Sequence, residues 1–386
     1  MKIYFDENMP FAKEFFSHIS GVDTQLIPFS GRDLTAQTVV DADGLLVRSI
    51  TQVNEALLSK NNRLFFVGTA TIGTDHIDEE YLTKRGIRFY SAPGCNAISV
   101  AEYVLSALVV LAERYLLDLF SLTVGIVGGG NTGTRLSEKL MALGIPYKIC
   151  DPHLEQKSSD KRTFFSLEEV LTCDVISLHV PKVTQGKYPT YRLLHQDNLI
   201  KLRDDQILIS ACRGDVIDNH ALLALKKAGH GIKLVLDVWQ GEPEVLRELI
   251  QYTELATAHI AGYSLEGKAR GTELLYRALC QQLNEAQRQQ IAPEYHLADF
   301  LPSAGISLIE IKQNFNQLLL NQLVKMVYDV RRDDAIFRQQ LAEVGFDQIR
   351  KTYPVRREFS AVTITGTKAK GIEIIHQLGF SKIKHD

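Results

Sequence analysis

A glycine-rich segment lies directly between an apolar run and a helical pattern, and this arrangement restricts the fold more than any other feature of the chain. The apolar run is the expected strand Thr123–Val127, and the three glycines of a G-x-G-x-x-G pattern follow it at Gly128, Gly130 and Gly133. The first glycine permits a tight turn, the second a close approach of the backbone to a pyrophosphate, and the third close packing of helix on strand. The pattern predicts the dinucleotide-binding turn of a Rossmann-type domain, whose helix start offers N–H groups to phosphates.

An acidic residue strengthens this interpretation. Asp151 ends the next expected strand, 21 residues after Gly130, where a carboxylate suits ribose hydroxyls and repels a 2′-phosphate. We therefore expect NAD rather than NADP. The alternative interpretation is a glycine turn in an α/β protein that binds no ligand. The glycine pattern by itself permits this alternative, but the strand before it, the helix after it and Asp151 together favour dinucleotide binding.

Alternating strand and helix patterns predict parallel sheets on both sides of this motif. The first ninety residues carry five short β-rich runs (Ile3–Phe5, Gln25–Ile27, Leu45–Val47, Leu64–Val67, Ile87–Tyr90). A long helix is expected from Ala97 to Tyr115. Beyond the glycines, a helix from Thr132 to Leu143, a helix opened by a capping box at Ser166, and four further strands are expected (Tyr147–Ile149, Val175–Leu178, Ile207–Ser210, Leu234–Leu236).

From about residue 290 the pattern becomes helical and polar, and we interpret it as an appended module. Helices are expected at Ile311–Val330 and Phe337–Val344, followed by a single strand at Ala361–Thr365 and a closing helix. An apolar stripe in this module fits either a subunit interface or a core within the chain: Leu318, Leu319, Leu323, Val324 and Val327.

Composition excludes several classes of protein. The 386 residues exceed what one hydrophobic core usually supports, so at least two domains are expected. The net charge of −3 and the dispersed basic residues argue against a nucleic-acid partner. Five cysteines without a CxxC pair favour a reducing cytoplasm and no metal site. We expect neither a signal peptide, because Asp6 and Glu7 interrupt the start, nor a membrane span.

Three polar residues beyond the ends of expected strands suggest redox chemistry on an alcohol. Arg213, Glu242 and His259 each follow a buried run, where ligands bind in open α/β sheets. Oxidising a hydroxyl beside a carboxylate needs a base, a partner for that base and a cation, and these three residue types meet those needs. Singly, each also fits an ordinary loop position: a solvated charge, a turn residue and one histidine of eleven.

Six segments together carry a family resemblance. The chain resembles the D-specific 2-hydroxyacid dehydrogenase family over residues 40–290. The segments that carry the resemblance are GTATIGTDHID, NAISVAEYV, VGGGNTG, ACRGDVID, DVWQGEP and HIAG. The resemblance implies a discontinuous, flavodoxin-like α/β substrate domain (1–97 and 259–287), a Rossmann-type NAD-binding domain (98–258) and a C-terminal α+β dimerisation domain (288–386). A cleft between the first two domains and a homodimer through the third are implied as well.

The resemblance also implies roles for individual residues. Arg213, Glu242 and His259 are the implied catalytic set, with His259 as proton acceptor in oxidation. Substrate contacts are implied for Ser49, Thr71, Arg213 and Tyr263. Cofactor contacts are implied for the glycine loop, including Asn131 and Thr132, and for Asp151, Val180, Ala211, Cys212, Arg213, Asp237 and Gly262. Val180 stands where the family commonly has Thr, so a side-chain contact with the cofactor is lost there.

Three longer segments indicate the substrate class within the family. The chain resembles those members of the family that oxidise a phosphorylated four-carbon 2-hydroxy acid, a step towards pyridoxal 5′-phosphate. The segments concerned are SAPGCNAISVAEY, HVPKVTQGKYPTYRLL and HIAGYSLEGKARGT. Arg48, beside Ser49, is our first candidate for binding the phosphate. Further candidates are Lys268 and Arg270, together with Arg356 and Arg357, which could reach a site across a dimer. Another D-2-hydroxyacid dehydrogenase, such as one acting on phosphoglycerate, and an NAD-sensing binding protein are the alternatives.

Overall fold

The chain divides into two compact units. The computed structural model describes residues 1–17, 19, 23–31, 33–283, 295–366 and 370–383. Unit 1 comprises Met1–Asn96 and Tyr263–Pro302, and unit 2 comprises Ala97–Gly262 and Ser303–Asp386. The chain therefore passes between the units after Asn96, after Gly262 and after Pro302, and the first two passages lie next to the expected limits at residues 97 and 258. The expected limit at 287/288 lies outside the described residues, and a separate C-terminal domain stays a prediction.

Unit 1 is built on five parallel strands in the order β2-β1-β3-β4-β5, the flavodoxin-like order. All five expected strands are present, with limits shifted by one or two residues: β1 (Lys2–Asp6), β2 (Gln25–Phe29), β3 (Gly44–Val47), β4 (Phe66–Thr69) and β5 (Arg88–Tyr90). The helical segments are α1 (Ala12–Phe16), α2 (Glu55–Leu58), α3 (Glu79–Lys84), α11 (Leu265–Gln282) and η3 (Leu297–Asp299).

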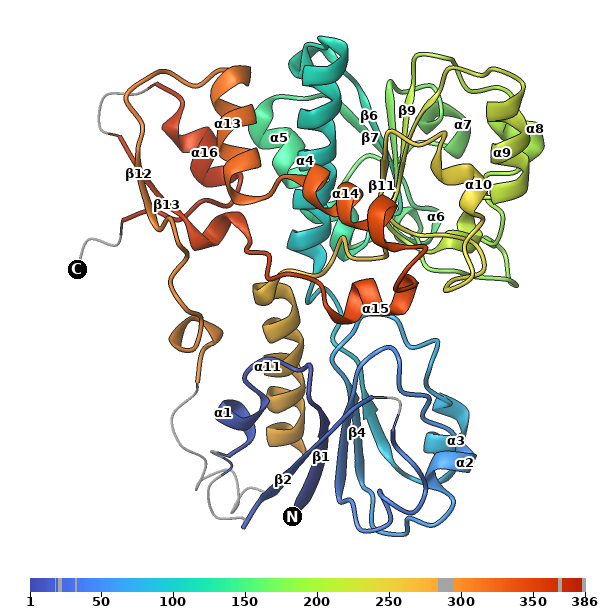
Figure 1. The fold of residues 1–386 in the computed structure, drawn as a ribbon, viewed down its shortest axis with the longest axis vertical. Helices are drawn as coiled ribbons and strands as arrows, with labels where there is room; N and C mark the ends of the chain where they lie inside the picture. The colour runs from blue at the N-terminus through green and yellow to red at the C-terminus, as the bar shows by residue number, and fades with distance from the viewer. Residues whose placement is uncertain (18, 20–22, 32, 284–294, 367–369, 384–386) are drawn as a thin grey trace. The chain divides into compact units, whose positions relative to one another are not determined.

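Helices cover both faces of this sheet (Figure 1), which explains why β3 and β4 are buried along their whole length. Phe66 of β4 joins a core with Phe15 of α1 and Leu275 of α11. Its neighbour Val67 points the other way and joins a second core, to which α2 and α3 contribute. The core on the α11 side therefore combines side chains from both chain segments of unit 1.

Unit 2 contains six parallel strands in the order β11-β10-β9-β8-β6-β7. Their limits are β6 (Val124–Val127), β7 (Tyr147–Cys150), β8 (Val175–Leu178), β9 (Ile207–Ser210), β10 (Lys233–Leu236) and β11 (Leu255–Ala256). Because β7 and β8 flank β6 on opposite sides, the strand order reverses at β6. Ligands bind at such a switch point, and the glycine motif follows β6 directly.

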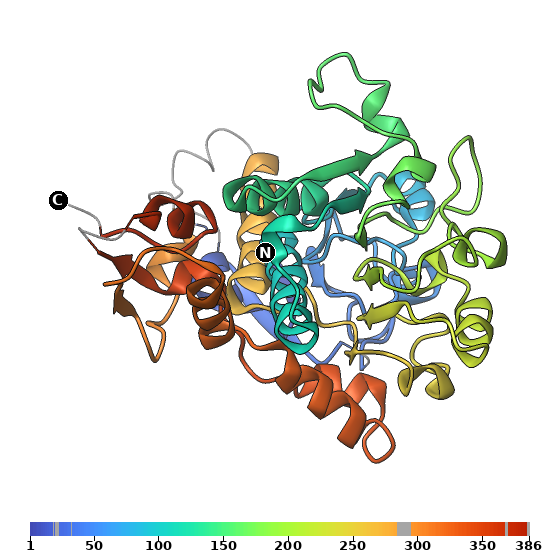
Figure 2. The ribbon, with the colours of Figure 1, turned by 90° about the horizontal axis from the view of Figure 1, so that it is seen from above.

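Helices cover this sheet, and the longest of them is α4. Its limits, Ala97–Tyr115, match the expectation, and the helix is buried along most of its length. It packs against α5 on one side and against α13 and α14 on the other, and Figure 2 shows the orange and red C-terminal segments beside teal α4. The other helical segments are η1 (Leu119–Ser121), α5 (Asn131–Leu143), α6 (Pro152–Glu155), α7 (Leu167–Val170), α8 (Gln196–Leu199), η2 (Gly214–Val216), α9 (Asn219–Lys227) and α10 (Arg247–Ile250).

The C-terminal module, residues Ser303–Asp386, differs from the expectation. It contains β12 (Leu308–Glu310), α13 (Gln317–Val327), α14 (Val330–Gln340), α15 (Phe346–Lys351), η4 (Phe359–Ala361), β13 (Thr363–Thr365) and α16 (Ile372–Gln377). The expected helix at Ile311–Val330 is wrong in its first part, because the Asn316 side chain caps α13 and starts the helix at Gln317. The single expected strand is a parallel pair of β12 and β13.

Most of the apolar stripe of α13 is used within the chain. Leu319, Leu323 and Val324 are buried, whereas Leu318 is 62% exposed. Because α13 packs on α4, the stripe forms a core within unit 2. It therefore gives no independent support to a subunit interface.

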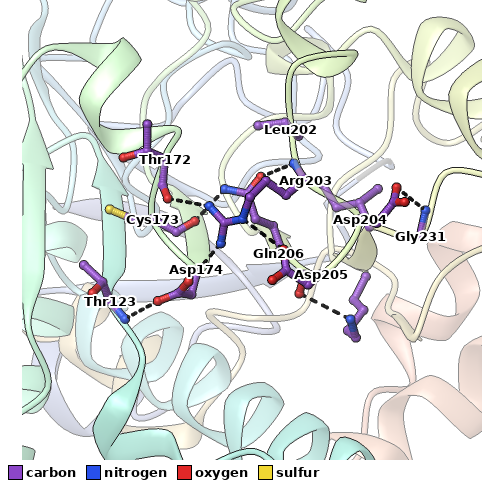
Figure 3. A network of polar contacts seen from close by, with 12 residues as sticks. Thr123, Thr172, Cys173, Asp174, Leu202, Arg203, Asp204, Asp205, Gln206 and Gly231 are labelled. Carbon is purple, nitrogen blue, oxygen red and sulfur yellow. Dashed lines mark hydrogen bonds and ion pairs between the residues drawn. The ribbon is translucent and has the colours of Figure 1, made fainter.

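A polar network joins the amino ends of the strands in unit 2 (Figure 3). Arg203 donates to the carbonyl oxygen of Thr172 (2.7 Å) and to Asp174 (2.9 Å). Gln206 donates to the carbonyl oxygens of Leu171 (2.8 Å) and Cys173 (2.6 Å). These groups lie at the opposite ends of the strands from the glycine motif, so we assign them to stability. In the part of the chain described, no helix is long and apolar enough to cross a membrane.

Candidate active site

The glycine loop after β6 is shaped to receive a phosphate. Gly128 has a φ of +99°, and a Cβ there would lie 2.5 Å from the carbonyl oxygen of His179. A Cβ on Gly133 would lie 2.0 Å from the carbonyl oxygen of Gly128, so both positions require glycine. A Cβ on Gly130 would meet no atom within 4 Å. Gly130 therefore leaves open space at the start of α5, beside Asn131 and Thr132, as a dinucleotide-binding turn requires.

Two side chains hold this loop. Asp151 accepts a hydrogen bond from the backbone N–H of Gly129 (2.9 Å) and also caps α6. Arg162 donates to the carbonyl oxygen of Gly129 (2.9 Å) and to the hydroxyl of Thr134 (3.0 Å), and it pairs with Asp160. The partly exposed Asp151 carboxylate thus faces the loop where a ribose is expected, and Asp160 balances the charge of Arg162.

Other expected cofactor residues follow the neighbouring strands β8 and β9. Val180 lies two residues after β8, and its Cγ1 would be 2.9 Å from a Cβ on Gly128. Ala211 and Cys212 follow β9 directly. Burial raises the pKa of the Cys212 thiol, so this residue is a packed neutral group. All of these positions lie at the carboxyl edge of the sheet.

The structure brings Glu242 and His259 together. Glu242 follows β10 and His259 follows β11, and these strands are neighbours in the sheet. The Nδ1 atom of His259 lies 2.7 Å from Oε2 of Glu242. The other carboxylate oxygen of Glu242 accepts a hydrogen bond from the backbone N–H of Trp239 (2.7 Å). Nε2 of His259 is the ring nitrogen that remains to face a substrate.

The environment of Glu242 keeps its carboxylate ionised. Burial is the largest single influence and raises the pKa of this carboxyl, and the charge of His259 is the largest of several influences that lower it. Hydrogen bonds from His259 and from the Trp239 backbone, together with the charge of Arg350, lower it further. The net pKa of Glu242 is below its usual value, so it presents a negative charge to the imidazole.

The backbone around His259 is held by a buried aspartate. His259 has a φ of +55°, in the left-handed region that only glycine enters freely. The carboxylate of Asp237 accepts hydrogen bonds from the backbone N–H groups of Ile260 (2.8 Å) and Ala261 (3.0 Å) and from the hydroxyl of Thr257 (2.7 Å). Asp237 therefore secures the chain between His259 and Gly262.

Arg213 lies on the next loop of the same sheet edge. It precedes η2, and its Nη1 donates to the carbonyl oxygen of Cys212 (2.8 Å). The neighbouring Gly214 lies so close to the backbone of Trp239 that a Cβ would be 2.0 Å from its carbonyl oxygen. This close approach joins the Arg213 loop to the Glu242 loop.

Apart from Arg213, which belongs to unit 2, the expected substrate residues lie in unit 1. Ser49 follows β3 and Thr71 follows β4, and the Thr71 hydroxyl donates to the carbonyl oxygen of Gly73 (3.0 Å). Two cations flank the ring of Tyr263: the Arg48 guanidinium at 5.4 Å and the Lys268 ammonium at 4.6 Å from its centroid. Such a pair around a phenol provides positive charge for an anionic group.

Two of the additional phosphate candidates are engaged within the chain. Arg270 donates to the carbonyl oxygen of Cys95. Arg356 is 2% exposed and lies 3.6 Å from the centroid of the Tyr328 ring. Its guanidinium donates to carbonyl oxygens of Ala261 and Ser99 in its own chain, which argues against a role across a dimer.

Several residues that shape the site escaped the sequence analysis. Arg162 lies 33 residues beyond Gly129, in a polar loop without a pattern that marks it. Gly214 was detectable in principle, since a glycine directly after Arg213 signals a close backbone approach. Arg350 comes from the C-terminal module, and only tertiary packing brings it near Glu242.

The comparisons with known proteins agree with this fold. Residues 109–261 match the NAD binding domain of D-isomer specific 2-hydroxyacid dehydrogenases, and residues 300–379 match a domain family described as being of unknown function. Solved structures share the fold. D-lactate dehydrogenase from Aquifex aeolicus, complexed with NAD and lactic acid, superimposes with a TM-score of 0.58 at 24% identity, covering 75% of this chain and 97% of that one. NAD⁺-bound 3-phosphoglycerate dehydrogenase from Entamoeba histolytica does so with a TM-score of 0.61 at 22% identity, covering 77% and 99%.

The fold and the site thus define a D-isomer specific 2-hydroxyacid dehydrogenase. Full-length relatives narrow the assignment. The erythronate-4-phosphate dehydrogenase of Colwellia psychrerythraea is 70% identical over 99% of this chain and 100% of its own length. That of Tolumonas auensis is 49% identical, over 99% of both chains. The chain belongs to the erythronate-4-phosphate dehydrogenase family.

Proposed function

We propose that the protein oxidises 4-phospho-D-erythronate to (R)-3-hydroxy-2-oxo-4-phosphobutanoate, with NAD⁺ as the oxidant, in a step towards pyridoxal 5′-phosphate. The name of the 70% identical relative supports the substrate. The observation that carries the chemistry is the 2.7 Å contact of His259 with Glu242 at the carboxyl edge of the NAD-binding sheet. It supplies a base with a negatively charged partner.

His259 is the proposed proton acceptor. Its Nε2 takes the proton of the C2 hydroxyl while the hydride leaves C2, so the alcohol loses two electrons and two hydrogens. Glu242, ionised because its pKa is lowered, stabilises the imidazolium that forms. Asp237 holds the backbone that carries His259.

Arg213 is the proposed carboxylate ligand. A guanidinium binds a carboxylate through two parallel hydrogen bonds and polarises the forming C2 carbonyl. NAD, when bound by the glycine loop and Asp151, supplies the hydride acceptor. The carboxylate of Asp151 disfavours a 2′-phosphate and therefore favours NAD over NADP.

Unit 1 is proposed to bind the rest of the substrate. Ser49, Thr71 and Tyr263 are the proposed hydrogen-bonding groups. Arg48, which lies beside the Tyr263 ring, is the proposed ligand of the phosphate.

We also propose a cytoplasmic homodimer formed through residues 288–386, which include the C-terminal module. All five cysteines are free thiols, which suits a reducing compartment. Light scattering during gel filtration should give twice the chain mass of 43.3 kDa. A monomer mass at assay concentration would contradict the proposed dimer.

A single-turnover assay tests the function. Purified protein is mixed with NAD⁺ and 4-phosphoerythronate, 3-phosphoglycerate or D-lactate, and NADH absorbance is followed with and without 2-oxoglutarate. We expect rapid NADH formation on 4-phosphoerythronate, and His259→Ala should slow it by about 10²–10⁴-fold. Preference for 3-phosphoglycerate would indicate a different dehydrogenase. Binding of NAD without turnover of any acid would favour a sensor.

A further inference from the structure

A buried arginine of the C-terminal module contacts the backbone next to the proposed proton acceptor. Nη1 of Arg356 donates to the carbonyl oxygen of Ala261 (2.9 Å), two residues after His259. Nη2 donates to the carbonyl oxygen of Ser99 (2.5 Å) at the start of α4. Both acceptors lie within three residues of a passage of the chain between the units, after Gly262 and after Asn96. One guanidinium therefore holds both segments on the unit 2 side.

The Arg356 contact completes the anchoring of the His259 segment. Asp237 binds the N–H groups of Ile260 and Ala261, and Arg356 binds the carbonyl oxygen of Ala261. His259 itself has a φ of +55°, and such a backbone costs on the order of 1–3 kcal/mol unless its surroundings impose it. Contacts on both sides of the chain are the means by which this backbone is imposed.

Arg356 is itself fixed in position. Its guanidinium lies against the ring of Tyr328, 3.6 Å from the centroid. Glu358, two residues on, accepts a hydrogen bond from Ser99 Oγ (2.8 Å), and the backbone of Phe359 donates to Glu102 of α4 (3.2 Å). Arg356 is thus part of a buried set of charges that joins the C-terminal module to α4.

The same module also supports Glu242. Phe337 of α14 stacks on Trp239 with ring centroids 5.5 Å apart. The backbone N–H of Trp239 donates to Glu242. The C-terminal module therefore packs behind both members of the Glu242–His259 pair.

We propose that Arg356 is a positioning residue of the active site: by binding Ala261 and Ser99, it makes the C-terminal module hold the backbone of His259 for proton transfer. This inference rests on the proposed function only for its kinetic consequence. It gives the module a role within its own chain, separate from subunit association.

Two substitutions in the full-length protein test the role of Arg356. Arg356→Met removes the charge and the donors at similar length, and Arg356→Lys keeps the charge but cannot bridge both carbonyls. We expect Arg356→Met to lower kcat by about ten- to a hundredfold, because small misplacements of a catalytic group cost this much, with KM changed less than about twofold. Arg356→Lys should recover part of kcat. If Arg356→Met does not fold, Arg356→Lys carries the same comparison.

A matched control and a double mutant separate positioning from stability. Arg331→Met changes a 53% exposed arginine of the same module and should leave kcat unchanged. In a His259→Gln background, Arg356→Met should lower the residual rate by less than about threefold, since coupled residues are not additive. An equal factor in both backgrounds, or a lower Tm with unchanged kcat, would overturn the inference.

Hydrogen–deuterium exchange tests the anchoring without activity. Amides in residues 257–264 should exchange faster in Arg356→Met than in wild type, and at the wild-type rate in Arg331→Met. Equal exchange in all three proteins would refute the anchoring. If wild type forms no NADH from 4-phosphoerythronate, the proposed function fails, while the exchange result still decides the role of Arg356.

Discussion

The chemistry assigned to this chain depends on two residues that hold opposite charges during the reaction. Glu242 is ionised despite burial, because His259, the Trp239 backbone and Arg350 together outweigh the cost of desolvation. When His259 takes up a proton, the imidazolium therefore faces a negatively charged carboxylate. At the scale of residues, the proposed chemistry depends on the groups that contact the two carboxylate oxygens of Glu242.

Replacing Glu242 by Gln should keep the shape of the site and remove its charge. The amide cannot stabilise an imidazolium, so kcat should fall on the order of 10²-fold while the Kd for NADH, measured by fluorescence, stays within about twofold. Glu244→Gln, an exposed neighbour on the same loop, serves as control. Retention of full kcat in Glu242→Gln would remove Glu242 from the mechanism.

Arg48 should discriminate between phosphorylated and unphosphorylated substrates. Hydrogen bonds to a charged group contribute about 1.5–3 kcal/mol, so Arg48→Ala should raise KM for 4-phosphoerythronate by roughly ten- to a hundredfold. KM for erythronate should change little. Arg63→Ala, which alters a surface arginine of the same unit that is 61% exposed, is the control. Equal effects on both substrates would disprove the assignment.

At the scale of elements, the two ends of the unit 2 strands have different tasks. The carboxyl ends carry the glycine loop, Glu242 and His259, whereas the amino ends carry the network around Arg203 and Gln206 (Figure 3). Ligands bind at the carboxyl edge of such sheets. Substitutions at the amino edge should therefore change stability and leave catalysis intact.

Gln206→Leu tests this separation. Gln206 is 1% exposed, and its loss leaves the carbonyl oxygens of Leu171 and Cys173 without this donor. The free energy of unfolding from urea denaturation should fall by about 1–3 kcal/mol, with kcat and KM unchanged at 25 °C. Exposed Gln251→Leu should change stability by less than about 0.5 kcal/mol. A lowered kcat in folded Gln206→Leu would contradict the division.

The sequence predicts elements best where burial is continuous along the chain. The strands at Val175–Leu178 and Ile207–Ser210 and the helix α4 are correct to the residue, because their apolar patterns are local. β12 was missed because only one of its three residues is partly buried and its partner, β13, lies more than fifty residues away. The Glu242–His259 pair was expected from residue types at strand ends, but only the fold places the two side chains 2.7 Å apart.

At the scale of the whole molecule, buried charges join the C-terminal module to α4. Glu102 is fully buried near Lys139, Glu358 and Arg356. Burial, more than the neighbouring Glu358, raises the pKa of Glu102 to about 7, against the opposing charges of Lys139 and Arg356. The folded protein therefore holds a proton here that the unfolded chain releases.

This proton makes stability depend on pH. Between the ordinary value of 4.5 and about 7, the native state binds more protons at Glu102 than the unfolded state does, so the free energy of unfolding falls as pH rises. Glu102→Gln removes this dependence. The Tm of wild type minus that of Glu102→Gln should decrease from pH 5 to pH 7.5 in calorimetry. Parallel Tm curves would show that Glu102 does not titrate in this range.

The discontinuity of unit 1 has a consequence for synthesis on the ribosome. The core around Phe66 needs Leu275 and Leu279, which are translated about 180 residues after the first segment of the unit ends at Asn96. At roughly 5–20 residues per second, the nascent segment waits about 10–35 s for its missing helix. During that interval the apolar face of the unit 1 sheet is accessible to chaperones. Unit 2 therefore begins to fold before unit 1 is complete.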